Sequence, residues 1–153
     1  MRSIYKIVVC SLLTLSITSC EKDLLEKEQY QKEIYLIGAY NRVWTTEVSY
    51  SNEEVKTYFT VSSSGTLALD RDVNVKMKIN EELVDIYNKK YWTVLNEDKY
   101  YKSLDTDLYS IPSLENTVIK HAEGISTEVP VLIKTASLKI DQSYVIPVEI
   151  EST

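Results

Sequence analysis

VNVKMKINEELVDIYNKKY, residues 73–91, changes its hydrophobic period halfway along. Apolar residues fill every second position of its first half: Val73, Val75, Met77 and Ile79. This alternation is typical of a strand with one buried and one solvent-facing side. Asn80 can then cap a helix whose first turns are acidic and whose last turn carries Lys89 and Lys90. The stretch therefore predicts a strand followed by one short helix at about 81–90.

Within the predicted helix, three large side chains fall at helical spacing: Leu83, Ile86 and Tyr87. Residues three and four apart share one face of a helix. We expect this face, Tyr87 included, to be buried.

Period-two alternation recurs in other parts of the chain. The further candidate strands are 34–37, 55–61, 117–119, 129–133 and 144–150. Pro130 and Pro147 lie inside two of them and cannot donate to a ladder, so those strands are edges or turn the proline away from a neighbour. We predict a mainly β protein, an antiparallel two-layer β-sandwich of about six to eight strands with the short helix near 81–90.

The amino terminus has the parts of a secretory signal. Arg2 and Lys6 precede an uncharged apolar run, and small residues lead into Cys20. The run is shorter than the roughly 20 residues that span a bilayer, which disfavours a permanent anchor helix. Ile17-Thr18-Ser19-Cys20 resembles a bacterial lipobox, so we predict cleavage before Cys20 and lipidation of its thiol. An ordinary secreted protein with a free thiol at Cys20 is the alternative.

The charged residues after Cys20 suggest a tether between the lipidated cysteine and the folded domain. Residues 21–32 are charged and lack an obvious core face, and the run at 21–23 resembles the export signal of some Bacteroidota surface lipoproteins. We therefore predict a signal peptide at 1–19, a lipidated cysteine and charged tether at 20–32, and a β-sandwich domain at 33–153. The expected location is the cell envelope, as an outer-membrane lipoprotein exposed at the surface.

Charge and cysteine content exclude several functions. The chain carries 17 basic and 23 acidic residues, a net charge of −6, and loss of Arg2 and Lys6 with the signal would leave −8. Nucleic acid needs a basic patch, so it is not an expected partner. The same charge opposes docking on anionic lipid, and the membrane should be contacted only through lipid on Cys20. With Cys10 in the signal, no thiol remains for a disulfide, metal or catalysis.

No residue pattern indicates catalysis, a metal or a cofactor. His121 is the only histidine and lies in a glycine-containing turn, where a solvated role is the ordinary one. Carboxylate pairs are available at 53–54, 70–72, 81–82 and 105–107. Glycoside hydrolysis needs two carboxyl groups across a cleft, and calcium needs several oxygen ligands, but each pair is also explained as a solvated surface. We predict that the protein is not an enzyme.

Aromatic residues are the best candidates for binding. The chain has 12 Tyr and two Trp against one Phe, with a dense group at 87–101 and a looser one at Tyr40, Trp44 and Tyr50. Sugar rings stack on aromatic faces, and Tyr and Trp add polar edges. The candidate glycan-binding residues are Trp44, Tyr91, Trp92, Tyr100 and Tyr101, with the two tryptophans as the main platforms. Alternatively, these side chains fill the rim of the sandwich.

Four stretches together resemble the amino-terminal domain, of unknown function, of Bacteroidota surface lipoproteins. They are VNVKMKINEELVDIYNKKY (73–91), LNEDKYY (95–101), TVIKHAEGISTEVPVLI (117–133) and LKIDQSYVIPVEI (138–150). Tyr87-Asn88 and the Tyr-Val-Ile-Pro of 144–147 match its motifs, and the likeness covers about 33–151. Asn96 replaces a usual proline, and the turn at 120–124 is about one residue longer than usual.

This resemblance implies an immunoglobulin-like β-sandwich that stands ahead of other domains. Those domains include endo-β-N-acetylglucosaminidases and laminin-G-like or discoidin-like domains in glycan-capture systems. Three functions follow: a non-enzymatic module that binds glycan or positions partners such as outer-membrane glycan-uptake proteins, a pure spacer or scaffold, or the truncated stub of a surface glycoside hydrolase. Exposure of Trp44 and Trp92 on one surface would favour the first, and their burial the second.

Overall fold

The computed structural model describes residues 31–38, 43–51, 53–65, 67–92, 94–139 and 142–153. The chain divides into two compact units, Met1–Gln31 with Gly65–Leu67, and Lys32–Ser64 with Ala68–Thr153. Only Gln31, Gly65 and Leu67 of the first unit are described, and the second unit contains all of the described strands and the helix. The predicted signal peptide, Cys20 and most of the tether lie outside the described residues.

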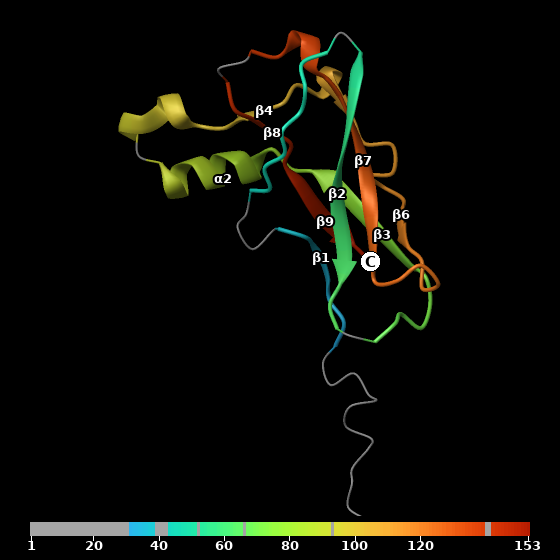
Figure 1. The fold of residues 1–153 in the computed structure, drawn as a ribbon. Helices are drawn as coiled ribbons and strands as arrows, with labels where there is room; N and C mark the ends of the chain where they lie inside the picture. Colours follow the sequence, from blue (N-terminus) through green and yellow to red (C-terminus); the bar gives the residue numbers. More distant parts are fainter. Residues whose placement is uncertain (1–30, 39–42, 52, 66, 93, 140–141) are drawn as a thin grey trace, which may run out of the picture. The chain divides into compact units, whose positions relative to one another are not determined.

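The first sheet is antiparallel and has the strand order β1-β2-β7-β5. Its strands are β1 (Ile34–Leu36), β2 (Glu54–Ser63), β7 (Ser126–Lys134) and β5 (Tyr109–Ser110). The long strands β2 and β7 run side by side in register from Glu54 opposite Lys134 to Ser62 opposite Ser126 (Figure 1). They are the two central strands of this layer.

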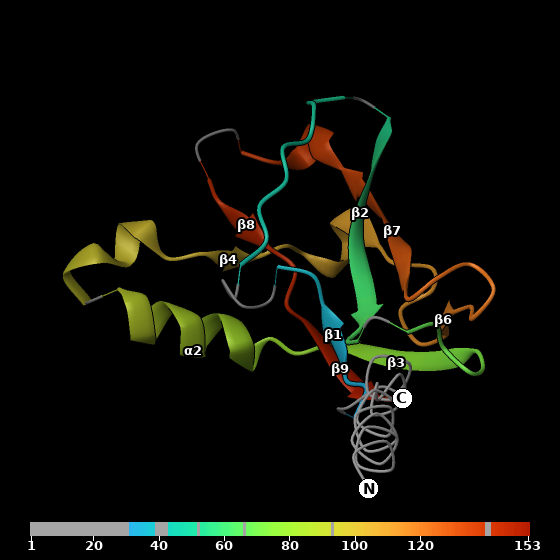
Figure 2. The ribbon, with the colours of Figure 1, turned by 60° about the horizontal axis from the view of Figure 1, so that its bottom comes forward.

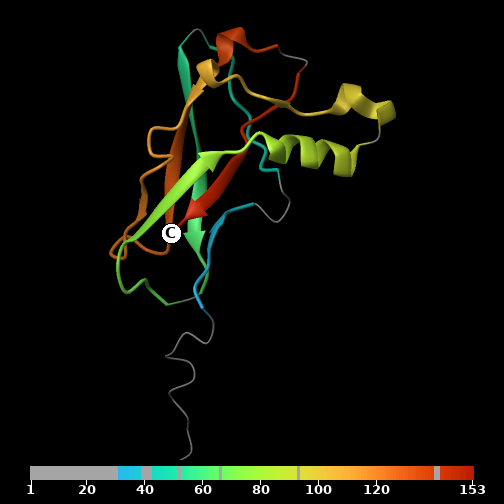
Figure 3. The same cartoon turned by 180° about the vertical axis from the view of Figure 1, so that it is seen from behind.

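The second layer is a smaller antiparallel sheet with the order β6-β3-β9. Its strands are β6 (Thr117–Ile119), β3 (Val73–Ile79) and β9 (Val148–Ser152). Seen from behind, β3 and β9 cross over β2 and β7 (Figure 3). A separate parallel pair joins β4 (Lys102–Ser103) to β8 (Tyr144–Val145). The described residues thus form a β-sandwich, as predicted.

The described part of the chain has nine strands, more than the six to eight expected. The difference comes from three two-residue strands, β4, β5 and β8, which are too short to show a period of two. Pro147 also divides the expected strand at 144–150 into β8 and β9. The alternation pattern therefore failed to predict the two-residue strands and the break at Pro147.

Pro130 shows how β7 tolerates a proline. It lies opposite Tyr58. The N–H of Ser63 points toward β7, where it donates to Ile125, whereas the Thr60 carbonyl points toward β1 and accepts from Ile37. Because backbone groups alternate sides along a strand, those of Tyr58 point away from β7. The missing N–H of Pro130 therefore removes no hydrogen bond between β2 and β7, as predicted for a proline that faces away.

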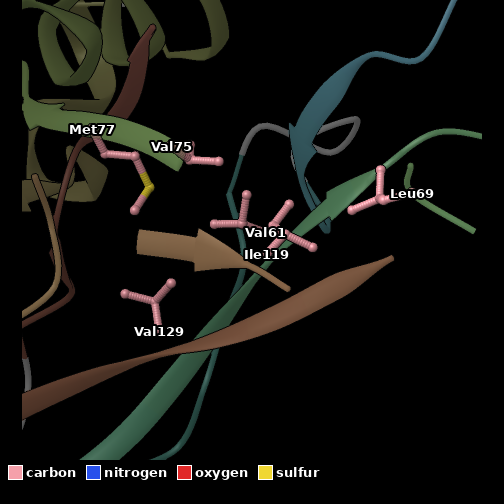
Figure 4. Close-up of a cluster of buried hydrophobic side chains, with 6 residues drawn as sticks. All are labelled: Val61, Leu69, Val75, Met77, Ile119 and Val129. Carbon is pink, nitrogen blue, oxygen red and sulfur yellow. The ribbon is translucent and has the colours of Figure 1, made fainter. Parts of the chain in front are cut away.

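Side chains from both layers meet in one core cluster. Its buried members are Val61, Leu69, Val75, Met77, Ile119 and Val129. Figure 4 shows Val61, Val75, Met77, Ile119 and Val129 gathered between β2, β3, β6 and β7, with Leu69 at one side on the segment before β3. Alternate positions of β3 are buried while its lysines face solvent, which confirms the period-two reading of 73–79. The core therefore forms where the alternating faces of the two sheets meet.

The one α-helix among the described residues is α2 (Glu82–Tyr91), close to the predicted 81–90. Asn80 Oδ1 accepts the N–H of Glu82 at 3.2 Å. The helix and the following 3-10 turn η3 (Val94–Lys99) extend to one side of the strands (Figure 2). Two more 3-10 turns are η4 (Thr106–Leu108) and η5 (Thr135–Ser137).

The helix is buried on a different face from the one expected. Val84 and Asn88 are its buried residues, whereas Leu83 is 37% and Ile86 is 57% exposed. Tyr87 is half-buried. The prediction was wrong for Leu83 and Ile86 because the buried face is set by an amide that bonds the backbone of a later segment. No helix in the described ranges combines the length and apolarity that a bilayer-spanning helix requires.

Candidate functional site

A wide groove of about 950 Å³ opens on the side of the sandwich near α2. Its floor is the second hydrophobic cluster, in which Leu104, Val131 and Ile133 are buried and Phe59 is partly buried. Residues of α2, of segment 43–50 and of β8 also line it. Ligand sites in proteins commonly occupy hollows of roughly this size, about 300–1,000 Å³. We refer to this hollow as the groove.

Two exposed aromatic side chains of segment 43–50 line the groove. Trp44 is 60% and Tyr50 is 64% exposed. Tyr58 of β2 borders the groove as well, but its ring lies on the opposite face of the strand, beside Lys56. Exposed aromatic side chains that gather around one hollow often mark a contact site. We refer to Trp44 and Tyr50 as the aromatic rim.

The ring of Trp44 lies against a glycine. Gly38 has φ +85°, a conformation that L side chains rarely adopt. A Cβ at this position would lie 2.5 Å from Cε3 on the edge of the Trp44 ring. The indole therefore abuts bare backbone while most of its surface stays open to solvent.

The groove is almost free of charge. Among its described lining residues, Lys139 carries the single charge. The polar lining is neutral: Thr45, Thr46, Thr57, Thr135, Gln142 and Ser143. In a chain with 23 acidic residues, the described lining contains no carboxylate. This environment suits a neutral ligand that offers apolar faces and hydroxyl groups.

The predicted binding residues fall in two places. Trp44 and Tyr101 line the groove, whereas Tyr91, Trp92 and Tyr100 are absent from its described lining. Tyr91 is 48% exposed and packs against Tyr87 with the rings tilted by 37° and their centroids 4.5 Å apart. The two tryptophans are therefore not members of one groove.

Trp92 is a poor platform in this structure. The residue is half-buried, and its indole Nε1 is buried without a hydrogen-bond partner among the described residues. Lys99 Nζ lies 5.8 Å from the centre of its ring. A buried indole edge and a covered ring leave little surface for a sugar.

Sequence reasoning did not select Tyr50, Tyr58 or Tyr144, all of which line the groove. In the sequence, Tyr50 belongs only to a loose aromatic group, and Tyr58 and Tyr144 lie in predicted strands. Only the pairing of distant strands brings these side chains to one hollow.

Asp72 and His121 form a close contact on an exposed surface. Asp72 Oδ1 lies 2.6 Å from Nδ1 of His121 and accepts the backbone N–H of the same residue at 3.0 Å. These two hydrogen bonds, the side-chain one first, hold the pKa of the Asp72 carboxyl below its ordinary value. Among the described residues, no group of three His, Cys, Asp or Glu side chains could hold a metal.

The Asp72 contact predicts a small pH effect on stability. A carboxyl whose pKa is lower in the folded state stabilises the fold above its ordinary pKa, and this contribution is lost as pH falls through the folded-state value. Wild type should thus be more stable than Asp72→Asn at neutral pH, and the difference should shrink as pH falls below the ordinary value of 3.8 and vanish only below the lower folded-state pKa. Denaturant unfolding at several pH values measures it, with the exposed Asp70→Asn as control. A difference that grows on acidification would contradict the contact.

Comparison with known proteins places the chain in a family. Residues 30–153 match the model of a family described as a "-like, N-terminal domain". No curated protein matches the sequence. A crystal structure of a multidomain protein including DUF1735 from Bacteroides ovatus is 16% identical, with a TM-score of 0.58, over 67% of this chain and 33% of that one.

A second crystal structure is that of a protein from Bacteroides ovatus proposed to bind carbohydrate. It is 23% identical with a TM-score of 0.49, over 66% of this chain and 28% of that one. The chain therefore spans about a third or less of the length of these two proteins. The first similarity shows a shared fold. By its match over residues 30–153, the chain belongs to this family of N-terminal domains, in keeping with the Bacteroidota surface domain that its motifs resemble.

Proposed function

We propose that the protein is a non-enzymatic module that binds glycan in the groove and is held at the cell surface by lipid on Cys20. The observation that carries the binding role is the aromatic rim, formed by Trp44 and Tyr50, around an almost uncharged hollow. The apolar face of a sugar ring stacks on indole or phenol, and its hydroxyl groups reach the polar edge of the site.

The composition of the groove supports binding over cleavage. Glycoside hydrolysis generally uses two carboxyl groups about 5–10 Å apart on either side of the scissile bond. The described lining residues include no carboxylate to play either role. A neutral glycan that stacks on the rim and bonds to threonine and tyrosine hydroxyls fits the residues that are present.

Replacement of Trp44 tests the proposal directly. Trp44→Ala removes the best stacking surface, and we expect affinity for a retained neutral polysaccharide to fall about tenfold, since one aromatic contact is worth about 1 kcal/mol or more. Affinity-gel retardation of the full-length, detergent-solubilised protein measures this. Tyr91→Ala is the matched control, because Tyr91 is similarly exposed but absent from the described lining of the groove.

A second variant tests the orientation of the ring. Gly38→Ala would push the Trp44 edge away and should weaken retention while leaving the indole in the protein. If wild type is retained by no glycan, the binding role is refuted. If Trp92→Ala weakens retention and Trp44→Ala does not, the site lies in the aromatic group near η3 and not in the groove.

The lipid on Cys20 is tested separately. Mass spectrometry of the mature amino terminus should find a cysteine that carries acyl chains, since stable anchoring needs more than one chain. An unmodified, uncleaved terminus would contradict the anchoring proposal and leave the glycan proposal intact.

A spacer or scaffold is the second candidate function. It is favoured by membership of a family of N-terminal domains, because such a domain can hold a following domain or a partner, such as an outer-membrane glycan-uptake protein, away from the bilayer. A genomic reading frame that continues past Thr153 into a glycosidase domain would instead identify the anchored stub of an enzyme.

A further inference from the structure

Strand β2 has an edge that is only partly paired. On one side it pairs with β7 from Glu54 to Ser62. On the other, β1 pairs only with Val61–Ser63, and Ile37 N–H donates to the Thr60 carbonyl at 2.9 Å. From residue 54 to 59, no backbone hydrogen bond joins this outer edge to any described residue.

The alternation of the ladder identifies which groups are free. Thr60 C=O and Ser64 N–H point toward the β1 side, where they bond Ile37 and Glu33. Residues two apart on a strand point the same way. The N–H and C=O groups of Tyr58 and Lys56 therefore point outward from this edge.

Segment 43–50 does not fill the edge. Its one hydrogen bond to β2 joins the side-chain hydroxyls of Thr46 and Thr57, 3.4 Å apart. Thr57 has its backbone groups turned toward β7 and its side chain in the groove. The segment thus covers the face of β2 and leaves the main chain of its outer edge unpaired within the described residues.

We propose that this edge of β2 accepts an extended segment of a partner protein as an added antiparallel or parallel strand. An unpaired edge supplies a row of backbone donors and acceptors, and a neighbouring hollow receives alternate side chains. The unpaired stretch spans about six residues, or roughly 20 Å at 3.3 Å per residue. This interaction does not rest on the proposed glycan binding, but it uses the same groove, so a bound segment and a glycan should compete.

The side chains at the edge define the chemistry of the partner. On the outer face, Lys56 is exposed, with its Nζ 5.1 Å from the Tyr58 ring centroid. On the other face, Thr57 and Phe59 line the groove. The fitting segment therefore alternates apolar residues, which enter the groove, with polar ones, and carries a carboxylate opposite Lys56, because oppositely charged cross-strand pairs stabilise a sheet.

Hydrogen exchange tests the added strand. The probe is a synthetic ten-residue peptide that alternates valine and threonine and has one central aspartate, added to the full-length, detergent-solubilised protein. Exchange of the Lys56 and Tyr58 amides should slow at least tenfold when peptide is bound, while that of the β7-paired amides changes little. A peptide with a central lysine in place of aspartate should bind several-fold more weakly.

Two variants make the test specific. Lys56→Pro removes an outward N–H without touching the β7 ladder, so the unfolding midpoint and glycan retention should persist while peptide affinity falls at least tenfold. Lys56→Glu should reverse the preference, favouring the lysine peptide. The proposal is overturned if millimolar peptide slows no exchange at Lys56 and Tyr58, or if Lys56→Pro binds as well as wild type. Slowing that rises with protein concentration in the absence of peptide overturns it in favour of a second copy of the chain.

Discussion

Ile119→Ala should lower the free energy of unfolding by about 3 kcal/mol, since truncating a buried isoleucine removes apolar burial and leaves a cavity. Ile119 is 0% exposed and meets side chains of both sheets in the main core cluster. The three-residue strand β6 offers few other contacts to compensate. Thermal unfolding should shift down by about 10 °C for a domain of this size.

Val118→Ala is the matched control for this prediction. Val118 is the neighbouring residue in β6, is only partly buried and points to the opposite face of the strand. Its truncation should cost about 1 kcal/mol or less. Equal losses for Val118→Ala and Ile119→Ala in urea unfolding would mean that β6 does not bury Ile119 as the structure shows.

The main strands could be predicted because their faces differ in polarity. Alternation located β3 at residues 73–79, where Val75 and Met77 are buried while Lys76 and Lys78 are exposed. The same rule found β2 and β7. It could not find β4, β5 or β8, since two residues cannot show a period. Their pairing depends on long-range partners that a local pattern does not contain.

The helix shows a different limit of sequence reasoning. Capping and charge located α2, but helical spacing assigned Leu83 and Ile86 to its buried face. Both residues are hydrophobic and were therefore expected to be buried. The side chain of Asn88 instead makes two hydrogen bonds with the backbone of Tyr101, and these direct another face of the helix inward. Leu83 and Ile86 are exposed because both line the groove.

The groove itself could not be predicted locally. Trp44, Tyr58 and Tyr144 come from an irregular segment, β2 and β8, and they meet only because β8 pairs with β4 beside the sheet that contains β2. Composition pointed to aromatic residues as a group. It could not distinguish Trp44, which is open beside Gly38, from Trp92, whose indole nitrogen is buried.

Asn88→Ala should destabilise the protein by about 2 to 4 kcal/mol. Asn88 is 4% exposed, and its Nδ2 donates to the Tyr101 carbonyl at 2.9 Å while its Oδ1 accepts the Tyr101 N–H at 3.0 Å. Alanine would leave both backbone groups without their partner, and each buried unsatisfied group costs about 1–3 kcal/mol. The same bonds tie α2 to the chain entering β4, which places Tyr101 at the groove.

Two further variants separate this role from simple loss of volume. Asn88→Asp has the same size but replaces the amide donor by an acceptor facing the Tyr101 carbonyl oxygen, so it should be about as damaging as alanine at neutral pH. Lys89→Ala, on the exposed side of the same turn, should stay within about 0.5 kcal/mol of wild type. Urea unfolding gives the stabilities, and near-ultraviolet circular dichroism reports the tyrosines around Tyr87. If Asn88→Asp were as stable as wild type, the amide could not be what sets the buried face of α2, and the exposure of Leu83 and Ile86 in the groove would need another cause.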